Sequence, residues 1–136
     1  MKADGPLAIH RKVALVARIW LTFLRVRSRL HAWPLPRLVA HLGRPARLRR
    51  PPVHDPRRLS RAVHGSLRLG RRRPACIMSS LVLFRLLRRQ GDPAELVIGL
   101  PERPVRKDAH AWVELTGQVV GPPPGRRGHA PMARYP

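Results

Sequence analysis

The chain has 136 residues, which favours a single domain with a modest hydrophobic core. Hydrophobic residues make up 43% of the chain and aromatic residues only 4%, so the core must be built mostly from aliphatic side chains. The single cysteine excludes an intramolecular disulfide and fits a reducing, cytoplasmic location.

The charge is strongly basic: 28 Lys and Arg residues face 7 Asp and Glu residues, which gives a net charge of +21. Nucleic acid is the first partner that such a balance suggests. The arginines are, however, spread from Arg11 to Arg134 instead of gathering in one segment, and this does not favour nucleic acid. A genome rich in G and C, or an acidic protein or peptide partner, explains the charge as well.

Residues 6–31 are predicted to form an amphipathic helix with Pro6 in its first turn. Its apolar residues recur at steps of three and four: Val13, Val16, Ile19, Trp20, Phe23 and Val26. We expect this face to pack on the core, with a membrane-surface or partner-binding helix as the alternative. Arginines interrupt the apolar stretch, so we expect no membrane span and no signal peptide.

Three further helices are predicted. A short one covers 38–42, and an exposed Pro- and Arg-rich linker follows over 44–53. Asp55 is a good N-cap for a third helix. The fourth helix, 75–89, is apolar on nearly every face and should therefore be buried, with Cys76 in its first turn.

The last third of the chain is predicted to form a small antiparallel sheet. Residues 95–100 read as a strand, and 108–115 alternate in polarity. One face of the second strand would carry Asp108, His110, Trp112 and Glu114. Thr116-Gly117 can turn the chain into a returning strand over 118–120. From Pro122 onward we expect a disordered Pro- and Arg-rich tail.

Cys76 and His110 are the residues best suited to covalent chemistry. A thiol is activated by a helix N-terminus and a nearby imidazole, and Cys76 begins a buried helix. The backbone N–H groups of that helix end could also stabilise an oxyanion. His110 lies on a strand that can approach such a helix. The pairing is spatial, because no local spacing links the two residues.

The segments Cys76–Gly91, Ala94–Leu100 and Ala109–Glu114, together with Gly117, resemble the transglutaminase-like fold. More narrowly, they are similar to the leader peptidases of lasso-peptide gene clusters. The resemblance implies an α+β fold with a transglutaminase-like (papain-like) core. In it, N-terminal helices are followed by a buried helix that bears the cysteine and by a small antiparallel sheet.

This resemblance also implies an organisation and a function. Residues 1–54 would form a basic helical region, 55–121 the catalytic core and 122–136 the tail. The protein would be a cysteine peptidase that removes the leader from a lasso precursor peptide. A separate leader-binding protein would present the precursor, and a separate ATP-dependent, asparagine-synthetase-like cyclase would take the core peptide. No metal or organic cofactor is implied.

The sequence departs from the family pattern at one position. The family places an aspartate twelve residues after the histidine, where this chain has Pro122. A three-residue hairpin loop, 115–117, would pair 114 with 118 and 110 with 122, so the third member of the triad would be missing. Asp108 is a possible substitute. Asp108 and Glu114 share a face with His110, but strand neighbours two and four residues away diverge from its ring, so we expect each carboxylate to be solvated or in a surface pair. Two other functions stay open: a basic nucleic-acid-binding protein and a catalytically weak processing scaffold.

Overall fold

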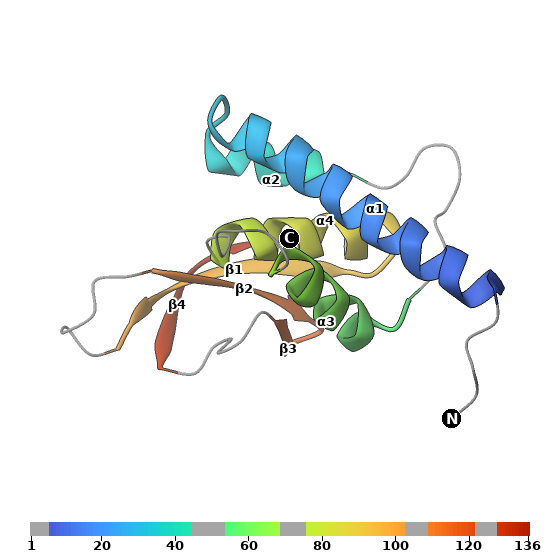
Figure 1. Ribbon diagram of the computed structural model, residues 1–136. Helices are drawn as coiled ribbons and strands as arrows, with labels where there is room; N and C mark the ends of the chain where they lie inside the picture. The colour runs from blue at the N-terminus through green and yellow to red at the C-terminus, as the bar shows by residue number, and fades with distance from the viewer. Residues whose placement is uncertain (1–5, 45–53, 69–75, 103–108, 122–127) are drawn as a thin grey trace.

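The computed structural model describes residues 6–44, 54–68, 76–102, 109–121 and 128–136, with side chains from residue 8 onward and without that of Cys76. Within these ranges the chain forms four helices and four strands (Figure 1). The helices are α1 (Pro6–Leu30), α2 (Leu35–Leu42), α3 (Pro56–Leu67) and α4 (Cys76–Arg89). The strands are β1 (Ala94–Pro101), β2 (His110–Leu115), β3 (Gln118–Gly121) and β4 (His129–Tyr135).

The four strands form one sheet in the order β3-β2-β1-β4, and every neighbouring pair is antiparallel. The helices lie on one side of this sheet, and α4 occupies the middle layer (Figure 1). One side of α4 packs on β1 and β2, and α1 and α2 cover its other side. The expected α+β architecture with a small antiparallel sheet is therefore confirmed.

The middle position of α4 explains its composition. The side chains of Leu81, Val82, Leu83 and Phe84 point in successive directions around the helix, and all of them are buried. A helix covered by the sheet on one side and by helices on the other has little surface left for polar residues, and its charged side chains are the half-buried Arg85, Arg88 and Arg89. The burial predicted for this helix is confirmed.

The start of α3 follows from its capping residue. The Asp55 carboxylate accepts a hydrogen bond from the backbone N–H of Arg58, with a donor–acceptor distance of 3.2 Å. This bond satisfies one of the backbone donors that every helix N-terminus leaves open. The predicted N-cap is confirmed.

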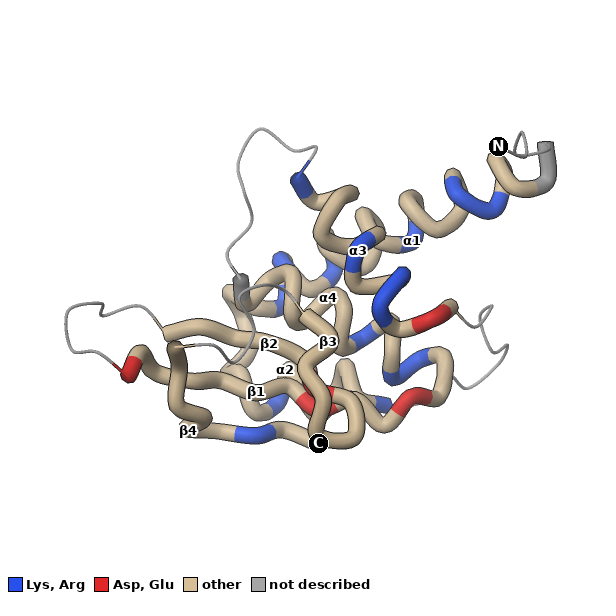
Figure 2. The backbone as a smooth tube through the Cα atoms, turned by 90° about the horizontal axis from the view of Figure 1, so that it is seen from below, with Lys and Arg blue, Asp and Glu red and all other residues tan. Residues whose placement is uncertain are grey.

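Helix α1 agrees with the prediction only over its C-terminal half. Ile19 and Val26 are fully buried, but Val13 is 61% and Val16 37% exposed. The first turns of α1 extend beyond the other elements (Figure 2), so their apolar side chains have no core to enter. The prediction is wrong for Val13 and Val16. Among the described residues, no helix has both the length and the apolar character that crossing a membrane requires.

The tail is also more ordered than predicted. Residues 129–135 form β4, which pairs with β1 along most of its length and includes Leu96↔Tyr135 and Pro101↔His129. Pro131 lacks a backbone donor, and an edge strand tolerates this loss better than a central one. The prolines and glycines over 121–125 concealed this strand, and the predicted disorder is wrong for 129–135.

The hairpin between β2 and β3 has a different register from the predicted one. Thr116 and Gly117 both have positive φ, 49° and 82°, which is the conformation of a two-residue turn. Leu115 therefore pairs with Gln118 and Glu114 with Val119, followed by a bulge. The predicted three-residue loop and the pairing of 114 with 118 are wrong, because Thr116 also adopts the left-handed conformation.

Candidate active site

Helix α4 and strand β2 meet where the two candidate catalytic residues are expected. The Ser80 hydroxyl donates a hydrogen bond of 2.9 Å to the carbonyl oxygen of Ala111 in the buried interior. Ser80 lies one helical turn after Cys76, the first residue of α4, and Ala111 directly follows His110. The first turns of α4 are thus fixed against the beginning of β2. The Cys76 side chain lies outside the described residues, so its distance to His110 stays a prediction.

Strand β3 leaves the beginning of β2 open to this approach. In the described residues, β3 pairs with β2 only over Val113–Leu115, and the Ser80 contact lies just before that segment. The other side of His110 is occupied, because its backbone pairs with Gly99 of β1. The ring of His110, like that of Trp112, lies on the face of the sheet that the helices do not cover, whereas Val113 packs on the helical side. The start of α4 can therefore reach the imidazole only around this edge of β2, past the end of β3.

The imidazole of His110 is buried, with 8% of the residue exposed, and lies among other rings. It stacks on Trp112 with 5.9 Å between ring centroids and an interplanar angle of 25°. His129 of β4 is also a neighbour, with 5.1 Å between its centroid and that of His110 and 6.5 Å to that of Trp112, so the three rings form one cluster. These contacts restrict the rotation of the His110 ring. His129 could not be placed here from the sequence, because its strand was not predicted.

Trp112 lies in the space that Gly99 leaves open. A Cβ atom at position 99 would be 2.6 Å from Cη2 of Trp112 and 2.8 Å from the carbonyl oxygen of Ala130. Neither distance is compatible with an unchanged structure, since one neighbour is a fully buried ring and the other is backbone. Gly99 is therefore required for the stack of Trp112 on His110.

Replacing Gly99 with alanine is expected to lower the free energy of unfolding by about 1–3 kcal/mol, the usual cost of overpacking a core. Urea unfolding measures this change. Gly65→Ala is the matched control, because a Cβ atom there meets nothing within 4 Å and alanine favours the helix. A Gly99→Ala protein as stable as the Gly65→Ala protein would contradict the close packing of Trp112.

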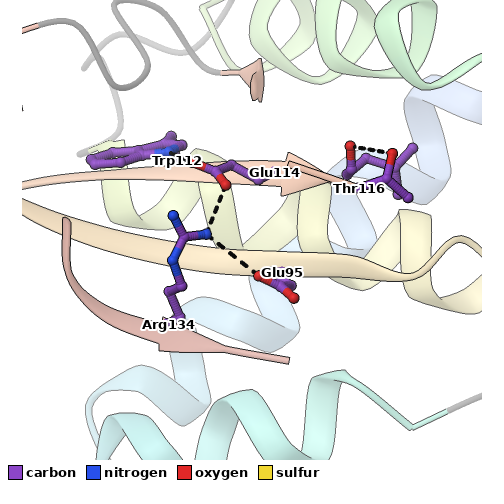
Figure 3. A network of polar contacts seen from close by, with 6 residues as sticks. Glu95, Trp112, Glu114, Thr116 and Arg134 are labelled. Carbon is purple, nitrogen blue, oxygen red and sulfur yellow. Dashed lines mark hydrogen bonds and ion pairs between the residues drawn. The ribbon is translucent and has the colours of Figure 1, made fainter. Parts of the chain in front are cut away.

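Glu114 anchors the other end of the Trp112 side chain (Figure 3). Its Oε1 accepts a hydrogen bond of 2.9 Å from the indole N–H of Trp112, and its Oε2 accepts one of 2.7 Å from Arg134. Arg134 also lies 3.5 Å from the carboxylate of Glu95, so it links β4 to both β1 and β2. The hydrogen bond to Glu114 is the main cause that raises the pKa of Arg134 above its ordinary value.

The sequence interpretation of Glu114 was therefore wrong. We expected a solvated carboxylate or a surface pair, whereas Glu114 is 2% exposed and accepts hydrogen bonds from the buried indole of Trp112 and from the exposed side chain of Arg134. Strand alternation correctly placed Glu114 on the face of His110 and Trp112. It could not show that β4 would cover this face and supply Arg134.

Glu114→Ala is expected to destabilise the protein by about 1–3 kcal/mol, because the buried indole N–H of Trp112 loses its acceptor. Glu95→Ala is the control, since Glu95 contacts the same guanidinium but its side chain is 44% exposed. A change within about 0.5 kcal/mol is expected for the control. Equal losses in both variants would argue against a special role of the Trp112 hydrogen bond.

The third member of a triad stays a prediction. Asp108 and Pro122 lie outside the described residues. The pairing of 110 with 122 was inferred from a hairpin register that the structure contradicts. The register argument that places position 122 opposite His110 is therefore wrong, whereas the departure from the family pattern at Pro122 does not depend on the register and stays a prediction.

The protein is of the α+β class, with helix α4 buried against one face of an antiparallel sheet. The candidate site lies where α4 meets β2, the strand that carries the buried His110. The family model described as "Transglutaminase-like superfamily" matches residues 15–134, and the chain belongs to this superfamily. Membership indicates activity of the cysteine-peptidase type. No curated protein and no solved structure matches the chain significantly. The match includes most of β4 and most of α1.

Proposed function

We propose that this protein is a cysteine peptidase that removes the leader from a ribosomally made lasso-peptide precursor. The observation that carries the proposal is the junction of α4 and β2. In a member of the transglutaminase-like superfamily, the helix that begins at Cys76 is fixed by Ser80 to the residue that follows His110. The narrower assignment to lasso peptides rests on the resemblance of the three sequence segments.

The chemistry follows from these positions. Cys76, as a thiolate, attacks the carbonyl carbon of the scissile bond, and His110 protonates the leaving amine. The first backbone N–H groups of α4 have no acceptor within the helix, and they stabilise the oxyanion that forms. Water then attacks the thioester, with His110 as the base. The rings of Trp112 and His129 keep the imidazole oriented.

The expected partners follow from the same resemblance. They are the precursor peptide, a separate leader-binding protein that presents it, and an asparagine-synthetase-like cyclase that closes the freed core peptide. Neither a metal nor an organic cofactor has a part in this reaction.

The test is cleavage of the precursor encoded beside this gene, with and without its leader-binding protein, followed by mass spectrometry. The expected products are intact leader and core that together have the mass of the precursor plus one water. Binding of the precursor without turnover would instead favour a processing scaffold. Retention of DNA or RNA at physiological salt, with no effect on the precursor, would favour a nucleic-acid-binding protein.

A further inference from the structure

A second candidate site lies in the helical layer, between α1, α2 and α4. It is a pocket of about 300 Å³ whose lining includes Arg25 and Arg29 of α1, His41 of α2, and Arg85 and Arg89 of α4. The two arginine pairs are each separated by one helical turn and come from different helices. None of these residues belongs to the candidate active site.

The pocket is positively charged, and the described residues that line it include no acidic side chain to balance this charge. The sequence contains no acidic residue between Asp4 and Asp55 or within α4. Four guanidinium groups therefore face a common space without a carboxylate among the lining residues. Burial is the main cause that lowers the pKa of Arg85, and Arg89, Arg29 and Arg25 lower it further.

Two of the four arginines have structural partners. Arg85 donates to the carbonyl oxygens of Leu42 and Arg44, both at 2.9 Å, and thereby holds the end of α2. Arg29 donates to Nε2 of His41, also at 2.9 Å. The Nε–H group of Arg89 is different, because it is buried and has no hydrogen-bond acceptor among the described residues. A buried donor in this state is unfavourable unless a ligand accepts from it.

We propose that this pocket binds an oxyanion with two or more negative charges, which accepts hydrogen bonds from Arg89 and Arg25. Guanidinium groups match the planar geometry of both carboxylates and phosphates. Four cations favour a ligand that carries more than one negative charge. The shared chemistry can come from free phosphate groups or from neighbouring carboxylates of an acidic peptide. This binding does not depend on the peptidase reaction.

His41 provides a reporter inside the pocket. It accepts a hydrogen bond from Arg29 at Nε2, so it is neutral in this arrangement. Partial burial lowers its pKa, and the charges of Arg29, Arg44 and Arg85 lower it further. Arg25 and Arg89 line the same pocket. A bound oxyanion is expected to raise the pKa of His41, because it offsets these positive charges.

The experiment measures binding by calorimetry at constant ionic strength, with inorganic pyrophosphate and a tetraglutamate peptide as probes. In the full chain, at least one probe is expected to bind. The double variant Arg25→Gln, Arg89→Gln is expected to weaken that binding at least tenfold, because it removes two charge-assisted donors. The control Arg27→Gln, Arg61→Gln loses the same two charges at exposed positions that do not line the pocket.

The result identifies the source of the ligand. Pyrophosphate binding assigns the pocket to phosphate groups, and peptide binding assigns it to an acidic peptide. Equal weakening in both double variants would overturn the proposal, because attraction to net charge would then explain it. Binding of neither probe would overturn it as well. If the pocket double variant does not fold, the single variant Arg25→Gln replaces it in the binding experiment. The pKa of His41 is then also measured by NMR titration with and without a saturating probe. A pKa that the probe leaves unchanged overturns the proposal.

Discussion

Cleavage of the precursor is expected to stop when Cys76 is replaced by alanine. Loss of the nucleophile in a serine protease costs on the order of 10⁶ in turnover, and the thiol of Cys76 holds the same position in the proposed reaction. Alanine is a good helix former, so α4 should still form. Single-turnover cleavage followed by mass spectrometry measures the loss. Cleavage by the Cys76→Ala protein would remove Cys76 from the mechanism.

The same residue allows a test that needs no substrate. Cys76 is the only cysteine, so alkylation of the protein by iodoacetamide reports on this position alone. A free cysteine has a pKa of about 8.5 and reacts slowly at pH 6. At a helix start beside an imidazole, the reaction at pH 6 is expected to be faster. His110→Gln should slow it, whereas His64→Gln, on α3, should not. Equal rates in these two variants would show that His110 does not face the thiol.

The helices and the central strands could be predicted because their signals are local. Asp55 at the start of α3 and the apolar surface of α4 each have a direct counterpart in the structure. The alternation along β2 correctly placed His110, Trp112 and Glu114 on one face. Such patterns depend only on the repeat of the helix or of the strand.

The errors concern contacts between distant segments. Val13 and Ile19 belong to the same apolar face of α1, yet Val13 is exposed and Ile19 is buried. The spacing of apolar residues cannot show where along a helix the core beneath it ends. The strand β4 follows a proline-rich stretch and carries both His129 and Arg134, so the surroundings of His110 and Glu114 were incomplete without it. The hairpin register depended on Thr116 adopting a positive φ, which is uncommon for a β-branched residue.

Trp112→Ala is expected to have the largest effect on stability of any substitution proposed above. Trp112 is fully buried, although it lies on the face of the sheet that the helices do not cover (Figure 3). Truncation of a buried tryptophan usually costs about 3–5 kcal/mol, a large part of the 5–15 kcal/mol that stabilises a typical domain. The change also removes the hydrogen bond to Glu114 and the stack on His110. The free energy of unfolding measured with urea should therefore fall strongly. The rate of precursor cleavage should fall strongly as well.

Trp33→Ala separates burial from the mere loss of a tryptophan. Trp33 is only half-buried and contacts Arg37, whose guanidinium lies 4.8 Å from the ring centroid, and His41. Its truncation is expected to cost about 1 kcal/mol, the scale of an exposed cation–π contact. Trp112→Phe is the second comparison, because it retains a ring beside His110 but gives up the indole N–H. If rigid support of His110 matters for turnover, Trp112→Phe should cleave faster than Trp112→Ala under conditions where both are folded. Equal turnover in the two variants would leave Trp112 a purely structural role.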